Sequence, residues 1–189
     1  MSLSGSGSSL RERVAGAILD SAATVLVAQG EQASMADVAA TAGVARATVY
    51  RYFPNRESLL EGLARATIDE AGGALESARL LEVDVDDALA RSIRALAGLG
   101  DRFVVVARQR GGAGSEEFER RVAAPVQAVL ERGRGEGRIR ADVPVTWLLE
   151  TLFAVTVSIL RAPPLGGLED RVAAINSLFL EGVRTRKFG

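Results

Sequence analysis

A chain of 189 residues with neither cysteine nor histidine can form no disulfide, no thiolate nucleophile and no Ser-His-Asp triad. Its net charge of −1 does not indicate a general nucleic-acid binder, and almost all its cations are arginine, an excess that codon bias in a GC-rich genome would also produce. Although 48% of the residues are hydrophobic, no apolar run reaches the ~18 residues that cross a bilayer, and we expect a soluble, cytoplasmic protein.

The N-terminal residues predict an arm followed by a helix. Residues 1–9 are serine and glycine except for Met1 and Leu3, a composition typical of a flexible arm or a cloning remnant. Apolar side chains then recur at the spacing of an amphipathic helix, at Val14, Ala17, Ile18, Ala22, Val25 and Leu26. Gly30 is expected to end this helix.

A second helix should begin directly after Ser34. Ser34 with Asp37 three residues later forms a capping-box pattern, in which each side chain bonds to the backbone amide of the other residue. Met35, Val38 and Ala39 would then point inward. A tight turn is expected at residues 42–44.

A third helix is predicted from Arg46 to Tyr52, ended by Pro54-Asn55. Val49 and Phe53 are four residues apart and can face a core, which leaves arginine and tyrosine side chains on the surface. The segment from Ala42 to Arg56 contains three arginines and no acid, so the positive charge is local. This is the arrangement of a helix-turn-helix that presents a recognition helix to a DNA groove.

The remainder of the chain predicts an all-α fold. A long helix should begin near Arg56, and further helices are expected at roughly 84–99, 101–110, 116–136, 143–161 and 168–186. Glycine-rich or proline-rich breaks separate several of these segments. No alternating strand pattern occurs.

Residues 13–60 closely resemble the N-terminal DNA-binding domain of TetR/AcrR-type transcriptional regulators. The matching elements occur in the same order: Asp37-Val38-Ala39, Ala42-Gly43-Val44, Thr48-Val49-Tyr50, Tyr52-Phe53 and Arg56-Glu57-Ser58-Leu59-Leu60. The resemblance implies a three-helix helix-turn-helix DNA-binding domain at residues 10–57, joined to a helical bundle for ligand binding and dimerisation at residues 58–189. It implies a regulator of transcription rather than an enzyme, most simply a repressor that a small molecule releases from a palindromic operator.

The resemblance places two residues at base edges. Arg46 and Ala47 begin the recognition helix. Arg46 would donate to O6 and N7 of a guanine, and Ala47 would lie against a thymine methyl group.

The resemblance assigns phosphate contacts to the neighbouring polar residues. Thr48, Tyr50 and Tyr52 would bind phosphates, with Tyr50 also able to reach a base. Arg56 would hold a phosphate at the N-terminus of the next helix. Ser34 would offer its hydroxyl or the amides that it caps.

Two residues depart from the family pattern. The family usually has serine at the position of Ala45, which caps the recognition helix, and often glycine at the position of Ala47. A missing cap removes about 1 kcal/mol of helix stability. A phosphate contact would be lost with it, so we expect weaker DNA binding.

The last two predicted helices indicate a homodimer. Residues 143–160 are apolar almost all round, and a near-heptad stripe follows at Leu168, Val172, Ile175, Phe179 and Val183. In a monomer these apolar surfaces would be exposed to water, which is unfavourable. We therefore expect them to pack against their copies in a second subunit and to form a four-helix interface. The family dimerises through these two helices, which implies a palindromic double-stranded DNA operator.

The resemblance also implies a site for an unidentified small-molecule effector inside the bundle. The candidate lining residues are Phe103, Val106, Arg110, Phe118, Trp147, Glu150, Thr151 and Phe153. Glu150 is the only charge between Trp147 and Leu160, and a buried carboxylate would need an arginine or a cationic ligand beside it. The alternatives are that Glu150 faces solvent or an arginine and that the aromatic rings form core. No cofactor and no metal is expected.

Other function classes find less support. Gly133, Gly135 and Gly137 lack the strand and the spacing of a dinucleotide fingerprint, and the acids at residues 116–119 suit a helix start rather than a metal site. A carboxylate enzyme would depend on Glu150 alone. A helical ligand-binding or scaffold protein with weak or idle DNA binding stays open, supported by the balanced charge and by Ala45.

Overall fold

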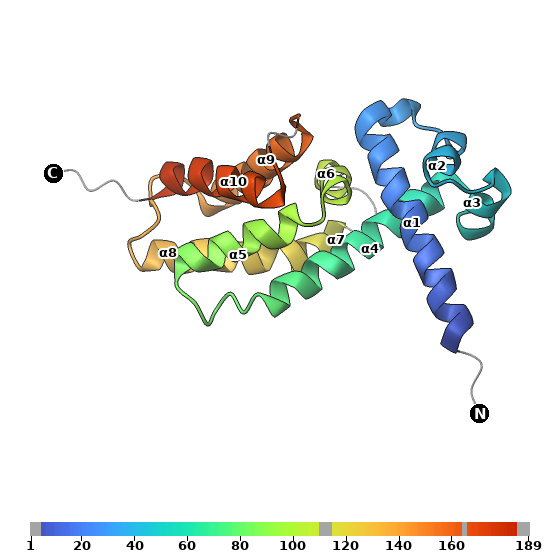
Figure 1. The fold of residues 1–189 in the computed structure, drawn as a ribbon. Helices are drawn as coiled ribbons and strands as arrows, with labels where there is room; N and C mark the ends of the chain where they lie inside the picture. Colours follow the sequence, from blue (N-terminus) through green and yellow to red (C-terminus); the bar gives the residue numbers. More distant parts are fainter. Residues whose placement is uncertain (1–4, 110–114, 164–165, 185–189) are drawn as a thin grey trace. The chain divides into compact units, whose positions relative to one another are not determined.

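The structure is a computed structural model that describes residues 5–109, 115–163 and 166–184, and it divides into two units, Met1–Ala66 and Thr67–Gly189. Helices make up both units (Figure 1), and extended pairing in the described ranges amounts to an isolated antiparallel bridge between Ile139 and Arg184. The predicted all-α fold is therefore confirmed. Among the described residues, no helix is long and apolar enough to cross a membrane.

The first unit is a small helical core. It contains α1 (Gly5–Gln29), the 3-10 turn η1 (Gly30–Gln32), α2 (Met35–Thr41), α3 (Arg46–Tyr52) and the first part of α4 (Arg56–Ser77). α1 and α3 both pack on α2. The most deeply buried side chains include Ile18, Val38, Val49 and Leu63. Of the predicted arm at residues 1–9, residues 5–9 belong to α1, which is helical from Gly5, and residues 1–4 lie outside the described residues.

The turn between α2 and α3 closes with a Schellman motif. The amide of Val44 donates to the carbonyl of Ala39 (3.1 Å), and the amide of Gly43 donates to that of Ala40 (3.2 Å). Gly43 has φ +65°, a left-handed conformation that costs glycine little. The predicted turn at residues 42–44 is thus confirmed, and it leads the chain into α3.

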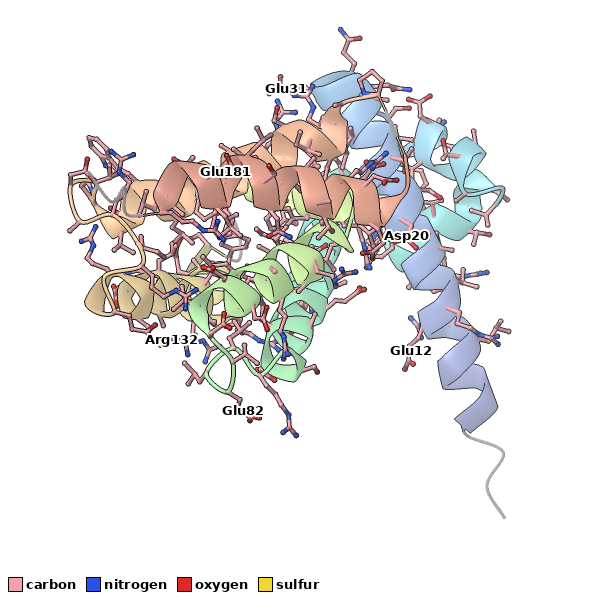
Figure 2. The ribbon with its side chains drawn as sticks, turned by 60° about the vertical axis from the view of Figure 1, so that its left-hand side comes forward. Glu12, Asp20, Glu31, Glu82, Arg132 and Glu181 are labelled. Atoms are coloured by element: carbon pink, nitrogen blue, oxygen red, sulfur yellow. The ribbon has the colours of Figure 1, made fainter. Side chains whose placement is uncertain are left out.

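The second unit is a helical bundle. It contains the rest of α4, then α5 (Val85–Ala97), α6 (Asp101–Arg108), α7 (Ser115–Phe118), the π turn η2 (Glu119–Ala123), α8 (Ala124–Gly135), α9 (Val145–Arg161) and α10 (Leu168–Val183). α5 packs against α8 and α10, and α9 packs against α6, α8 and α10. Arg132 of α8 extends to the loop that holds Glu82 (Figure 2), where it donates to the carbonyls of Leu81 (3.4 Å) and Val83 (2.9 Å).

The single helix predicted at residues 116–136 is interrupted by η2. Pro125, the second residue of α8, has no amide hydrogen to donate to a carbonyl one turn earlier, and the π turn lies directly before α8. Gly133 of α8 has a structural role. A Cβ on Gly133 would lie 2.6 Å from Cδ1 of Ile139 and 2.8 Å from Cγ1 of Val85, so glycine permits this close packing.

The apolar stripe on α10 faces its own chain, which corrects the prediction that it packs against a second subunit. Val172, Ile175, Phe179 and Val183 are all buried within the bundle, and α10 packs on α5 and α9. Leu168 is the exception, at 43% exposure. Helical periodicity identified the buried face of the helix but could not identify which chain buries it.

Candidate nucleic-acid interface

α3 presents two different faces because of the position of its apolar residue. Val49 is fully buried, whereas Arg46, Ala47 and Tyr50 are exposed and Thr48 is half-buried. The predicted base-reading residues therefore lie on the solvent side of the helix. The structure brings them together at its first two turns.

Arg46 and Tyr50 form a pair on this exposed face. The guanidinium Cζ lies 5.5 Å from the centroid of the Tyr50 ring, and Nη2 donates to the Tyr50 hydroxyl at 3.4 Å. That hydrogen bond raises the pKa of Arg46, whose guanidinium is a cation at neutral pH in any case. An exposed cation–π contact contributes only about 0.5–1 kcal/mol, so Arg46 can leave Tyr50 for a guanine or a phosphate.

A second aromatic–cation cluster lies at the C-terminal end of α3. Tyr52 is half-buried, and its ring is contacted by Arg51 from the same helix and by Arg11 from α1. Sequence reasoning assigned Tyr52 to a phosphate but missed Arg11. The arginine is visible in the sequence, but nothing there indicates that α1 places it against α3.

Arg56 ties the first helices together. As the first residue of α4 its guanidinium Nη1 donates to the carbonyl of Ala33, the residue before the Ser34 cap. The guanidinium keeps further N–H donors for a phosphate. Arg56 therefore joins the start of α4 to the start of α2, the two helix N-termini predicted to meet the DNA backbone.

The capping box at Ser34 is confirmed by hydrogen bonds in both directions. The Asp37 amide donates to Ser34 Oγ (3.2 Å), and the Ser34 amide donates to Asp37 Oδ2 (3.0 Å). The Ser34 hydroxyl also donates to Oδ2 (2.6 Å), and these bonds lower the pKa of the Asp37 carboxyl. Because the hydroxyl hydrogen is already donated to Asp37, the exposed start of α2 offers a phosphate its amides more readily than this hydroxyl.

α3 lacks a side-chain cap. Ala45 occupies the N-cap position with extended φ and ψ of −64° and 142°, and no side chain accepts a hydrogen bond there. Its carbonyl still accepts from the Thr48 amide at 2.8 Å. The predicted loss of the cap is confirmed.

We therefore expect Ala45→Ser to stabilise the protein. The extended backbone at Ala45 suits a serine whose Oγ accepts from the amides of the first turn, and such a cap contributes about 0.5–2 kcal/mol. Thermal or urea unfolding measures the gain. Ala45→Val is the control, because its side chain has no acceptor, and equal stability of the two variants would contradict the capping role.

The structure separates the predicted effector residues into two groups. Phe103, Val106, Phe118 and Phe153 are buried, and the Phe153 ring makes edge-on contacts with Phe103 (5.9 Å, 68°) and Phe118 (5.7 Å, 70°). These rings form an aromatic cluster between α6, α7 and α9. The alternative that they are core therefore agrees with their packing. Arg110 lies outside the described residues.

The other group lies on the exposed face of α9. Trp147 is 67% exposed, and Glu150 and Thr151 are exposed beside it, with the Thr151 hydroxyl donating to the Trp147 carbonyl (2.8 Å). The sequence left open whether Glu150 is a buried carboxylate of an effector site or faces solvent. The structure places it in solvent. The acids at residues 116–119 include Glu117, which pairs with Arg120 and Arg121, and the described residues hold no acid cluster suited to a metal ion.

The segment that forms this interface is similar to a known family of proteins. The model of bacterial regulatory proteins of the tetR family matches residues 18–63. The HTH-type transcriptional repressor LfrR of Mycolicibacterium smegmatis is 34% identical over 148 residues, which cover 78% of each chain. All the predicted DNA contacts lie within the segment matched by the family model.

Solved structures extend the similarity to both units. The crystal structure of the TetR-like transcriptional regulator LfrR from Mycobacterium smegmatis has a TM-score of 0.71 at 30% identity, covering 94% of this chain and 99% of that chain. The same regulator in complex with proflavine has a TM-score of 0.66 at 30% identity over the same shares.

Proposed function

Because this chain belongs to the TetR family of bacterial regulatory proteins, we propose that it is a dimeric repressor that a small molecule releases from a palindromic operator. Family membership makes it a DNA-binding transcriptional regulator rather than an enzyme. The observation that carries the proposal is the exposed face of α3, where Arg46, Ala47 and Tyr50 lie in a segment, residues 42–56, that contains no acid. Action on chromosomal DNA implies a cytoplasmic location.

Dimerisation is supported by the surface of α9 and α10. The two helices pack against each other, and each leaves an outer face exposed. Small or apolar side chains are exposed on both: Trp147, Ala154, Ser158, Ala173, Ser177 and Leu178. Trp147 and Leu178 expose 67% and 61% of their surface, which is unusual for large apolar side chains on a solvated helix. We propose that a two-fold partner covers this face, in place of the stripe that α10 buries in its own bundle.

Leu178→Glu is therefore expected to produce monomers and to abolish tight operator binding. A buried glutamate pair at a two-fold interface is costly, whereas in an isolated chain this exposed position tolerates the charge. Sedimentation equilibrium measures the mass, and anisotropy measures DNA binding. Leu81→Glu is the matched control, since Leu81 is 76% exposed in the loop before α5. A dimeric Leu178→Glu variant would contradict the proposed interface.

The operator can be identified by selection from random duplex DNA. A two-fold dimer should enrich sites with two inverted half-sites whose centres are about one helical turn, ~34–36 Å, apart. Enrichment of a single half-site would argue for a monomeric reader. Failure to enrich any sequence would count against the proposed function itself.

The effector is proposed to act by binding one conformation of the dimer better than the other. For release, it must bind the state whose recognition helices do not match both half-sites more tightly than the DNA-bound state. The proflavine complex of the LfrR regulator supports a small-molecule effector. Screening small molecules for release of the selected operator tests this. The predicted lining residues that the bundle buries, Phe103, Val106, Phe118 and Phe153, are the candidates for the effector site.

A ligand-binding protein with weak or idle DNA binding is the second candidate. It is favoured by the balanced charge of the chain and by the uncapped start of α3 at Ala45. Its signature would be weak affinity for every duplex with little dependence on salt, since loss of phosphate contacts lowers the salt slope. A steep salt dependence with sequence preference would exclude it.

A further inference from the structure

The ring of Tyr52 holds two cations that come from different helices. Arg51 of α3 places its Cζ 5.5 Å from the ring centroid, and Arg11 of α1 places its Cζ at 5.9 Å. Both arginines are exposed, and within the described ranges neither forms an ion pair with a carboxylate. The cluster therefore carries a net positive charge. Its two cations repel each other, and an anion bound between them would reduce that repulsion.

The same side chains line an open hollow. Leu10, Arg11, Arg51 and Tyr52 surround a space of about 400 Å³. α1 runs on toward its N-terminus past α3 (Figure 1), so the hollow lies between these two helices of the first unit. Glu12, the next residue along α1, projects from a different face of the helix, because consecutive residues are separated by about 100°.

The lining groups match the chemistry of a phosphodiester. Each of the two guanidinium groups can donate two parallel hydrogen bonds to phosphate oxygens, and the phenol hydroxyl can donate one more. The chain has no acid between Ala42 and Arg56 to compete for them. A solvated pair of arginines that only fastens α1 to α3 is the simpler alternative, and it predicts no effect on DNA binding.

We propose that Arg11, Arg51 and Tyr52 together hold a DNA backbone phosphate, so that α1 extends each half-site contact beyond the residues of the helix-turn-helix. This deepens the proposed function and rests on it, because the phosphate is that of the duplex read by α3. Arg11 is thereby assigned a direct contact with the DNA backbone, with no part in base recognition.

The test compares Arg11→Gln with Arg13→Gln, which removes the same charge from another face of α1. Fluorescence anisotropy is measured at several salt concentrations with the selected operator and with a random duplex. Arg11→Gln should weaken both complexes about 5–10-fold and lower the salt slope by about one, without changing base preference. Arg13→Gln should change affinity less than ~2-fold. Arg11→Lys, which keeps the charge, should restore the slope.

Wild-type affinity and slope in Arg11→Gln would overturn the proposal, whether or not its melting temperature falls. A lowered melting temperature with an unchanged slope would make Arg11 a structural contact only. The random duplex separates this inference from the proposed function. If the wild type prefers no sequence, the repressor proposal fails, while the slope difference on random DNA still decides whether Arg11 holds a phosphate.

Discussion

Replacing Phe153 with alanine is expected to lower the free energy of unfolding by about 3–5 kcal/mol, the usual range for a buried aromatic ring. Phe153 is 3% exposed and lies between Phe103 and Phe118, so its removal breaks two edge-on ring contacts and leaves a cavity between α6, α7 and α9. Urea unfolding at one fixed protein concentration measures the loss, because a dimer adds its association energy to the apparent stability.

Phe153→Leu is the matched control for that substitution. It keeps an apolar side chain of similar volume and should cost less than about 1.5 kcal/mol. The pair also separates the two interpretations of the aromatic cluster. Wild-type stability in Phe153→Ala, combined with loss of effector-induced release, would mean that these rings line an effector pocket rather than form core.

Arg46→Ala is expected to weaken operator binding by about 1–3 kcal/mol and to relax the preference at one base pair. Arg46 is the first residue of α3, is exposed, and among the residues that the structure describes it contacts Tyr50 through a weak hydrogen bond and a cation–π contact. It is therefore free to make the bidentate contact with guanine that gives an arginine its base selectivity. Anisotropy titrations with the selected operator and its single-base variants measure both effects.

Tyr50→Ala serves as the comparison for Arg46→Ala. It should cost a similar amount on every sequence if the tyrosine contacts mainly phosphate. Arg65→Ala removes an exposed arginine of α4 and controls for net charge. An Arg46→Ala variant that loses affinity equally for all base variants would show that Arg46 contacts the backbone and reads no base.

The helix-turn-helix was predictable because its determinants are local. The bonds between Ser34 and Asp37, and the left-handed Gly43 that ends α2, involve residues at most a few positions apart. The uncapped Ala45 was predictable for the same reason. The specific arrangement of such residues also made the family recognisable, and comparison with known proteins bears that out.

Predictions about the second unit were weaker because they depended on which surfaces meet. The helices were expected close to where they occur, but the stripe at Val172, Ile175 and Phe179 was assigned to a partner chain and packs instead within its own bundle. Trp147 and Glu150 were grouped with buried rings, although a helix that is apolar almost all round can still leave one face exposed. Hydropathy measures a tendency to be buried and does not identify the burying surface.

The sequence by itself determined where most helices lie, the caps and turns of the helix-turn-helix, and the family. Each of these depends on backbone bonds and side-chain periodicity over a few residues. Only the tertiary structure decided that Arg11 of α1 lies on Tyr52, that Arg56 bonds to Ala33, and that α10 faces α5. These contacts join helices far apart in the chain. They are set by how whole faces pack, which no local pattern encodes.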